Sequence, residues 1–316
     1  MRILAATDFS TRSQRAVRRA GILAREACAE LLLLHVIHGR TGSADVEIRE
    51  AERMLAEQVG AVPELAGVDT CPIVTTGTPG DAILDMAATR KVDVVVIGAP
   101  RKRLFRSVGP TIRRVIGAGP YPVLIVNREA KGSYTRALAP VDLCDVSAKA
   151  LRTALGLSLM DKANVTVVHA FTAFAKGKMS MVGIAKERIH DYVNMARAWA
   201  AHEVAVFMAA AGLRDQGWSG RVEEGSPLQV IMRSIERISP ELLVMGTHGR
   251  SGIVKALLGS VTEEALRSVD VDVLAVPPIR PALPNPALLD PPWERLPQQP
   301  LASASASRSL ALVKSG

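Results

Sequence analysis

Small and hydroxyl-bearing residues are concentrated in one stretch, residues 246–260, which has the sequence Gly-Thr-His-Gly-Arg-Ser-Gly-Ile-Val-Lys-Ala-Leu-Leu-Gly-Ser. A glycine directly after a strand lets the backbone turn and lets a ligand approach closely. Gly259 and Ser260 precede a helical pattern, where free N–H groups and the helix dipole favour an anion. The spacing differs from the GxxxxGK[ST] phosphate loop and from the GxGxxG dinucleotide fingerprint. We interpret the stretch as a nucleotide-binding loop of another type.

An interpretation without any ligand also fits these residues. Ser260-Val261-Thr262-Glu263 has the S-x-x-E form of a capping box, which would account for the serine by local hydrogen bonding. Gly246 and Gly249 could be turn glycines that follow a strand. The complete spacing, placed between a strand and a helix, favours the nucleotide site.

The elements that must position this loop are a buried strand, at Leu242–Met245, and a helix that opens after Ser260. Strands and helices alternate in the same way from the start of the chain. Expected strands cover residues 2–7, 30–37, 72–76, 93–97 and 123–126, and expected helices cover 12–29, 44–59, 80–89 and 111–116. This alternation predicts an α/β fold with an open parallel sheet and right-handed crossovers.

The amino-acid composition agrees with this fold class and limits the classes of partner that the protein is expected to bind. Aliphatic residues dominate and aromatic residues make up only 3% of the chain, which argues against a single-strand nucleic-acid binder with stacking platforms. The net charge of +8 favours anionic partners without choosing among them. The three cysteines form no C-x-x-C pair, so neither a disulfide framework nor a structural zinc site is expected. Without a signal-peptide pattern or an apolar run of about 18–20 residues, we expect a cytoplasmic protein with no membrane partner.

The chain contains an internal repeat. Arg136–Asp142 matches Arg2–Asp8 at an offset of 134 residues (142 − 8), and Gly246 matches Gly98 at an offset of 148 (246 − 98). The extra 14 residues (148 − 134) lie where the second copy has a longer helical arm, at residues 183–211. We interpret the apolar stripe of that arm as core or interface.

Repeats of this length predict two tandem domains rather than solenoid units. The predicted boundaries are a first domain at residues 1–128, a linker at 129–135 and a second domain at 136–279. Residues 280–316 are rich in Pro, Ser and Ala without a usable hydrophobic period. They are predicted to form a disordered tail.

The second copy resembles a domain of the universal stress protein family over essentially its whole length. The resemblance is carried by Pro140-Val141-Asp142 and His169-Ala170 at two strand ends, and by Met245-Gly246-Thr247-His248-Gly249 with Gly259-Ser260-Val261-Thr262. It implies two open five-stranded parallel-sheet domains of the Rossmann-like, adenine nucleotide alpha hydrolase-like class, packed as a pseudo-dimer. It also implies ATP, with or without Mg²⁺, at the carboxyl ends of the strands, where ligands of open α/β sheets generally bind.

The resemblance further implies a role for each matching residue. Asp142 and the backbone of Ala170 would contact the adenine end, and Gly246 and Gly249 would lie along the ribose and phosphates. His248 is a candidate phosphate contact. The remaining residues of the predicted set are Pro140, Val141 and Met245 beside the nucleotide, and Gly259, Ser260, Val261 and Thr262 around phosphate oxygens.

The first copy departs from this pattern. It keeps Asp8 and Gly98, but the glycine corresponding to Gly249 is missing and Pro110 stands where the second copy has Ser260. Proline has no N–H group to offer a phosphate, so we expect the first domain to bind ATP poorly or not at all. Its loop is basic instead, and we interpret it as a solvated face, with an anion or partner contact as the alternative: Arg101, Lys102, Arg103, Arg106, Arg113 and Arg114.

The sequence supports ligand binding better than it supports catalysis. His35 recurs as His169, which favours a structural role for both, and it makes a poor metal pair with His38 on the opposite strand face. No hydrolase or metalloprotease motif is present, so we predict no catalytic and no metal-binding residue.

The leading hypothesis is therefore an ATP-binding regulatory protein of the stress response, acting through an unidentified protein partner rather than nucleic acid. One alternative is an enzyme, a slow ATP hydrolase or a nucleotidyl-transfer protein of the same α/β class. The other is a ligand-free dimerisation and interaction module, because the strands at 123–126 and 271–276 come last in each half and can pair within one chain or between two chains of a homodimer.

Overall fold

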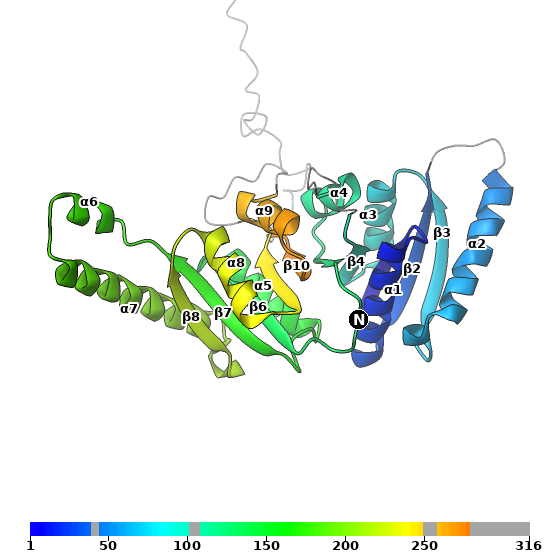
Figure 1. The fold of residues 1–316 in the computed structure, drawn as a ribbon. Coiled ribbons are helices and arrows are strands. Elements are labelled where there is room, and N and C mark those ends of the chain that lie inside the picture. Colours follow the sequence, from blue (N-terminus) through cyan, green and yellow to red (C-terminus); the bar gives the residue numbers. More distant parts are fainter. Residues whose placement is uncertain (39–43, 101–107, 249–257, 279–316) are drawn as a thin grey trace, which may run out of the picture. The chain divides into compact units, whose positions relative to one another are not determined.

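The computed structural model describes residues 1–38, 44–100, 108–248 and 258–278. We call residues 1–128 the first half and residues 136–279 the second half. The predicted tail at 280–316 lies outside the described residues. Within the described residues, strands and helices alternate in both halves (Figure 1).

Among the described residues, the first half contains five strands. Its elements are β1 (Arg2–Thr7), α1 (Thr11–Glu26), β2 (Glu30–Ile37), α2 (Ala44–Ala61), the short 3₁₀ helix η1 (Pro63–Leu65), β3 (Thr70–Thr76), α3 (Pro79–Arg90), β4 (Val94–Gly98), α4 (Pro110–Ala118) and β5 (Val123–Val126).

The second half repeats this order with one insertion between its second and third strands. Its elements are β6 (Arg136–Pro140), α5 (Asp145–Gly156), β7 (Asn164–Phe171), α6 (Lys176–Met181), α7 (Lys186–Ala210), the 3₁₀ helix η2 (Arg214–Gln216), β8 (Ser219–Glu224), α8 (Pro227–Ile238), β9 (Leu242–Gly246), α9 (Ser260–Ser268) and β10 (Asp272–Val276).

The strands form one ten-stranded sheet with the order β3-β2-β1-β4-β5-β10-β9-β6-β7-β8. All neighbours are parallel except β5 and β10, which pair antiparallel with Leu124 opposite Leu274. Each half therefore has the order 3-2-1-4-5, and the predicted pairing of the last strands within one chain is confirmed. This pairing satisfies the N–H and C=O groups that both edge strands would otherwise leave free.

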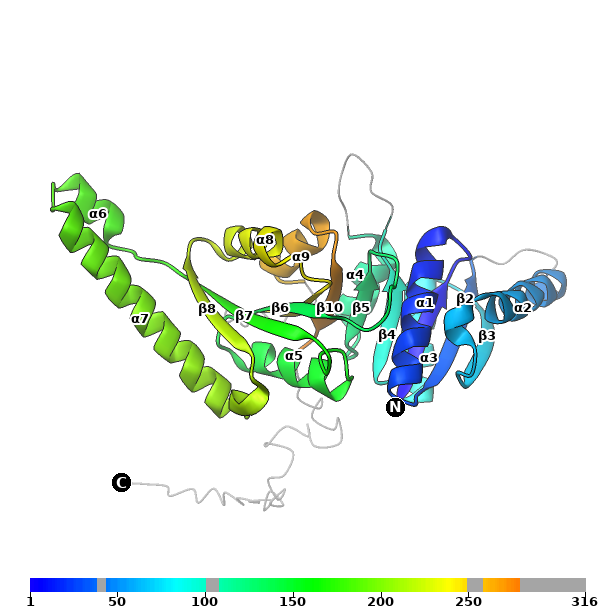
Figure 2. The same cartoon turned by 60° about the horizontal axis from the view of Figure 1, so that its bottom comes forward.

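Helices cover both faces of the sheet because alternate strand residues point to opposite sides. Ile3 and Ala5 pack with residues of α1, α2 and α5 in one buried cluster. Leu4 packs with residues of α3, α4, α8 and α9 in another cluster on the opposite face. Figure 2 shows α5 and α8 on opposite sides of the second-half strands. Near-continuous aliphatic strands of this kind are typical of parallel sheets buried on both faces.

A buried polar cluster ties the start of β10 to α1 and to the segment between the halves. The Asp272 carboxylate is 1% exposed and accepts hydrogen bonds from the Tyr134 hydroxyl at 2.7 Å and from the Asn127 backbone N–H at 2.8 Å. Arg19 is also buried, stacks 3.9 Å above the Tyr134 ring and lies 3.5 Å from Asp272, as an ion pair without hydrogen-bond geometry. The Arg19 guanidinium also donates to the Gly132 carbonyl oxygen. These contacts fix the course of the chain between the two halves.

Helix α1 is shorter at its C-terminal end than expected. The helix expected to run to residue 29 ends at Glu26, because Cys28 takes a left-handed backbone with φ of 49°. Its N-cap is Ser10, whose side chain accepts from the Ser13 N–H group.

The helical arm predicted at residues 183–211 forms α7, and its apolar stripe is only partly buried. Val193, Ala200 and Val204 of α7 are buried as expected. Met195 and Trp199 are 67% and 66% exposed, so the interpretation of the stripe as core holds for one side of the helix. No helix among the described residues combines the length and the apolar character that a membrane span requires.

Candidate functional site

A cavity of about 270 Å³ opens at the carboxyl ends of β6 and β9, where the strand order reverses direction in the second half. It brings together every described residue of the predicted site, although the residues are spread over 120 positions of the sequence. Gly249 lies outside the described residues. The lining residues are Pro140, Val141, Asp142, Ser147, Val168, His169, Ala170, Pro227, Val230, Ile231, Met245, Gly246, His248, Gly259, Ser260, Val261 and Thr262.

Asp142 is held at the cavity by the start of α5. The Ser147 hydroxyl donates to Asp142 Oδ1 at 2.6 Å and lies 3.2 Å from the Asp142 N–H group, which donates to it. These contacts hold the carboxylate in place at the edge of the cavity. Sequence reasoning missed Ser147. The signal was available, since the Asp-to-Ser spacing of five residues recurs at Asp8 and Ser13.

Gly246 ends β9 where α5 passes close to it. A Cβ atom at this position would lie 2.7 Å from the Val146 Cγ1 atom, so a larger residue would push strand and helix apart. The Thr262 hydroxyl donates to the Gly246 carbonyl oxygen at 2.8 Å. This contact anchors the first turn of α9 to the end of β9, and Thr262 itself is buried.

Gly259 is the N-cap of α9, and Ser260 is the first helical residue. The Gly259 N–H group donates to the Thr247 carbonyl oxygen at 2.7 Å, and a Cβ atom on Gly259 would lie 2.8 Å from that oxygen. Helical geometry leaves the N–H groups of Ser260, Val261 and Thr262 without partners inside the helix. The start of α9 thus presents donors at the edge of the cavity.

The capping-box explanation of Ser260 is wrong. No side chain caps α9, because the serine lies one residue inside the helix. Glu263 does not reach back to the cap but accepts from Arg113 of the first half at 2.6 Å, and it also pairs with Arg267. Arg113 belongs to the basic run that was interpreted as a solvated face, and Arg114 likewise pairs with Asp81 at 2.6 Å. These two arginines are bound within the protein.

The histidines divide into structural and site positions. His169 Nδ1 lies 2.8 Å from the Val141 carbonyl oxygen, and His35 Nδ1 lies 2.9 Å from the Thr7 carbonyl oxygen. The repeated contact confirms a structural role at the strand ends. His248 Nδ1 lies instead 2.9 Å from the Thr247 hydroxyl, and His169 and His248 both line the cavity.

The cavity combines apolar walls with polar groups at its rim. Val168, Ile231 and Met245 supply flat apolar surface, as is usual in small-molecule sites. Nearby, burial raises the pKa of the Cys144 thiol, and the neighbouring Asp142 carboxylate raises it further. The thiol therefore stays protonated and is a poor nucleophile at neutral pH. No group of three or more acidic, His or Cys side chains suited to a metal ion occurs among the described residues. The arrangement can bind a ring with an anionic extension.

Comparison with known proteins gives concordant results. The family model described as "Universal stress protein family" matches residues 1–127 and 133–277. A universal stress protein of Mycolicibacterium smegmatis is 24% identical over 310 residues, covering 87% of this chain and 97% of the relative. The universal stress protein E homolog of Haemophilus influenzae is 24% identical over 216 residues, covering 65% of this chain and 69% of the relative. The crystal structure of a universal stress protein from Archaeoglobus fulgidus superposes with a TM-score of 0.64 at 20% identity, covering 87% of this chain and 98% of that one.

Proposed function

This chain belongs to the universal stress protein family, and on that premise we propose that its second half binds ATP and that the protein acts as a nucleotide-dependent regulator in the stress response. The observation that carries the proposal is the position of the α9 N-terminus. Its unpaired N–H groups and the Ser260 hydroxyl lie on the same cavity as the Asp142 carboxylate and the apolar walls. Base, ribose and phosphate would each meet a suitable surface.

The base and ribose fit the inner part of the cavity. Small-molecule sites typically enclose roughly 300–1,000 Å³, and this cavity, at about 270 Å³, lies just below that range. The apolar side chains of Val168 and Ile231 would pack against the adenine ring, and the backbone of Ala170 would contact its polar edge. Asp142 would accept hydrogen bonds from hydroxyl or amino donors. Pro140, Val141 and Met245 would complete the walls.

The phosphates fit the start of α9. Its first N–H groups and helix dipole favour anions, and its N-cap, Gly259, has no side chain that could cover these groups. Because the Thr262 hydroxyl already donates to Gly246, we assign phosphate contacts to the backbone N–H groups of Val261 and Thr262 and to the Ser260 hydroxyl. His248 would lie beside them.

Magnesium would then be held mainly by the phosphates. Mg²⁺ prefers oxygen ligands and retains several waters when it binds with a nucleotide. Of the described lining residues, Ser260 and Asp142 carry suitable oxygens. Mg²⁺ bound with ATP would supply charge neutralisation along the phosphates.

The decisive experiment places a negative charge where the phosphates would lie. Ser260→Asp puts a carboxylate in the first turn of α9, where the dipole favours the helix, so folding is preserved while phosphate is repelled. Pro110→Asp places the same charge at the equivalent position of the first half and is the matched control. Isothermal titration with MgATP should give about one equivalent per chain for the parent and the control. For Ser260→Asp we expect an affinity at least about 100-fold lower, or about 2.7 kcal/mol.

Two results would refute the proposal. One is an absence of ATP both in freshly purified protein, as measured by mass spectrometry after denaturation, and on titration. The other is equal ATP affinity in Ser260→Asp and the parent. Sustained Mg²⁺-dependent hydrolysis that disappears in Asp142→Ala would instead support the hydrolase alternative.

A further inference from the structure

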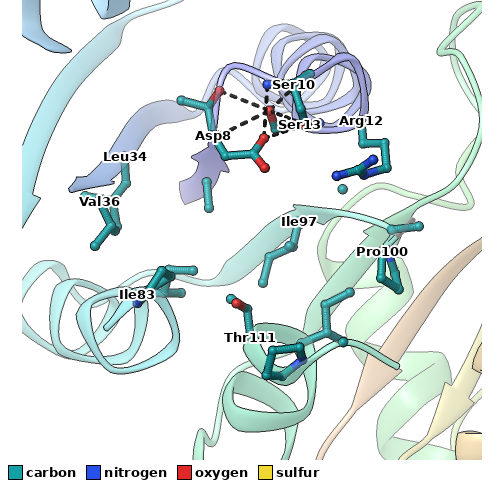
Figure 3. A pocket seen from close by; sticks show the side chains of 18 residues that line it. Asp8, Ser10, Arg12, Ser13, Leu34, Val36, Ile83, Ile97, Pro100 and Thr111 are labelled. Carbon is teal, nitrogen blue, oxygen red and sulfur yellow. Dashed lines mark hydrogen bonds between the residues drawn. The ribbon is translucent and has the colours of Figure 1, made fainter. Parts of the chain in front are cut away.

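The first half contains its own cavity, which the proposed function does not use. It measures about 250 Å³ and opens at the carboxyl ends of β1 and β4, the same place in the fold as the second-half cavity. Figure 3 shows Asp8, Ser10, Ser13 and Arg12 on one side of it, with Ile83 and Thr111 on the other. The inference below takes the second-half cavity as a nucleotide site for reference and in that respect rests on the proposed function.

The apolar walls of the first-half cavity are retained. Leu34, Ile83 and Ile97 occupy the positions that Val168, Ile231 and Met245 occupy in the second half. Protein interiors are normally packed with few voids larger than a water molecule. The two cavities differ in volume by only about 20 Å³ (270 − 250), so side-chain replacement has not closed the first one. The cavity keeps room for a ring-sized ligand.

Part of the donor set for a polyphosphate is not retained. Pro110 is the first residue of α4 and has no N–H group, whereas Ser260 offers an N–H and a hydroxyl at the matching position. Ile112 replaces Thr262. The N-cap also differs, because Gly109 has φ of 54°, in the left-handed region, whereas Gly259 has φ of −59°. The chain therefore enters α4 along a different path, with fewer groups for a chain of phosphates.

A single cation is added instead. Arg12 lines the first-half cavity where the second half has Val146. The Arg12 carbonyl oxygen lies 2.5 Å from the place of a Cβ atom on Gly98, and Val146 Cγ1 lies 2.7 Å from the place of a Cβ atom on Gly246. Both positions therefore adjoin the glycine at the end of the fourth strand of their half. No described carboxylate lies within 4.0 Å of the Arg12 side chain as an ion pair. Its guanidinium is thus available to one anionic group.

The neighbouring carboxylate is ready to accept hydrogen bonds. Asp8 Oδ1 accepts from the Ser10 backbone N–H at 3.1 Å and from the Ser10 hydroxyl. The Ser13 hydroxyl accepts from the Asp8 N–H at 3.2 Å. A carboxylate and a guanidinium on one rim balance each other in charge. Such a rim suits a ligand with hydroxyl donors and one anion better than one with several negative charges.

We propose that the first-half cavity binds a nucleoside monophosphate and discriminates against the triphosphate. The base packs between Leu34, Ile83 and Ile97. The ribose hydroxyls donate to Asp8, and the single phosphate pairs with Arg12. The two halves then hold nucleotides of different phosphate number, so the chain can respond to the ratio of a monophosphate to ATP.

The test uses full-length protein in which Ser260→Asp has closed the second-half site, with adenosine 5′-monophosphate as the probe. Calorimetric titration should show about one equivalent of monophosphate per chain. Arg12→Gln, which keeps the length of the side chain and removes its charge, should lower that affinity at least tenfold. Adenosine and MgATP should each bind at least tenfold more weakly than the monophosphate. Thermal unfolding of Arg12→Gln and of Arg12→Lys shows whether each variant is folded.

The outcomes separate this inference from the proposed function. No monophosphate binding, binding unchanged in folded Arg12→Gln, or equal affinity for adenosine, monophosphate and ATP would overturn the inference. If Ser260→Asp leaves ATP binding intact while Arg12→Gln removes monophosphate binding, the proposed function fails and the inference stands. If Ser260→Asp removes ATP binding and monophosphate binding is absent, the proposed function stands and the inference fails.

Discussion

At the start of its last helix, the second half has Ser260 and the first half has Pro110, although the two cavities share strand order, apolar walls and nearly the same volume. Beside the fourth strand, the first half has the additional polar side chain, because Arg12 stands where the second half has Val146. Duplicated α/β domains can thus keep a ligand cavity while exchanging the few polar groups that select the ligand. The fold provides the cavity, and its rim sets the specificity.

The two halves also differ in why each needs its glycine before the last helix. Gly109 adopts a left-handed backbone, which other residues rarely adopt. Gly259 has an ordinary backbone, but a Cβ atom would meet the Thr247 carbonyl oxygen at 2.8 Å. Equivalent glycines are therefore required by conformation in one half and by space in the other. A sequence comparison alone would treat them as the same feature.

The largest asymmetry is the buried cluster around Asp272, whose equivalent position before β5 is Pro122 at an offset of 150 residues (272 − 122). Asp272→Ala leaves the buried Arg19 guanidinium without its counter-charge and the Tyr134 hydroxyl without its acceptor. Breaking a buried ion pair by removing one partner typically costs about 3–5 kcal/mol. We expect a loss of this size in the free energy of unfolding, measured by urea titration at pH 7.

Tyr134→Phe is a milder substitution in the same cluster. It removes only the hydroxyl that donates to Asp272 and keeps the ring beneath Arg19, so we expect a loss of about 1–2 kcal/mol. An Asp272→Ala protein within about 1 kcal/mol of the parent would contradict the view that this cluster holds the junction between the halves.

Much of this asymmetry was beyond prediction from the sequence. Aliphatic runs such as Leu242–Met245 predicted the strands, because a buried parallel strand needs little more than continuous apolar residues. Asp272 was not singled out from the sequence, because its partners Arg19 and Tyr134 are more than 130 positions away. Contacts of that separation leave no local pattern. The repeat predicted equivalence between the halves, and the cluster is where equivalence fails.

The candidate site was predicted in its residues but not in their contacts. The internal repeat and the glycine spacing located Asp142, Gly246 and Gly259. The mistaken capping box at Ser260 arose because the four-residue pattern is the same whether the serine is the N-cap or the first helical residue. A shift of one residue decides between a serine bound to its own helix and one available to a ligand. Helix boundaries are uncertain by that amount in any sequence-based prediction.

Pro110→Ser tests directly whether the helix start explains the difference between the cavities. The change restores an N–H group and a hydroxyl at the first residue of α4. One regained hydrogen bond to a charged group contributes about 1.5–3 kcal/mol, so we expect the ATP affinity of the first half to rise about tenfold, by calorimetry in the Ser260→Asp background. Binding of the monophosphate, which is assigned to Arg12, should change by less than about twofold. Unchanged ATP affinity in a folded variant would shift the explanation to the left-handed Gly109.

The smallest expected effect concerns the pH dependence of Asp8. Burial acts to raise the pKa of this carboxyl, but hydrogen bonds from Ser10 and Ser13 and the charge of Arg12 outweigh it and hold the pKa below the usual value of 3.8. A carboxyl with a lowered pKa in the folded state stabilises the fold above its unfolded pKa and loses that contribution as the pH falls through the folded pKa. We therefore expect the difference in the free energy of unfolding between the parent and Asp8→Asn to be constant near neutral pH and to shrink below about pH 4.

Because the hydrogen bonds to Ser10 and Ser13 are short-range and the Arg12 attraction is screened by salt, most of the pH dependence should persist in 0.5 M NaCl. A difference between parent and variant that stays constant down to pH 2.5 would mean that these contacts do not favour the ionised carboxylate, and the balanced rim that sets the first half apart from the second would lose its physical basis.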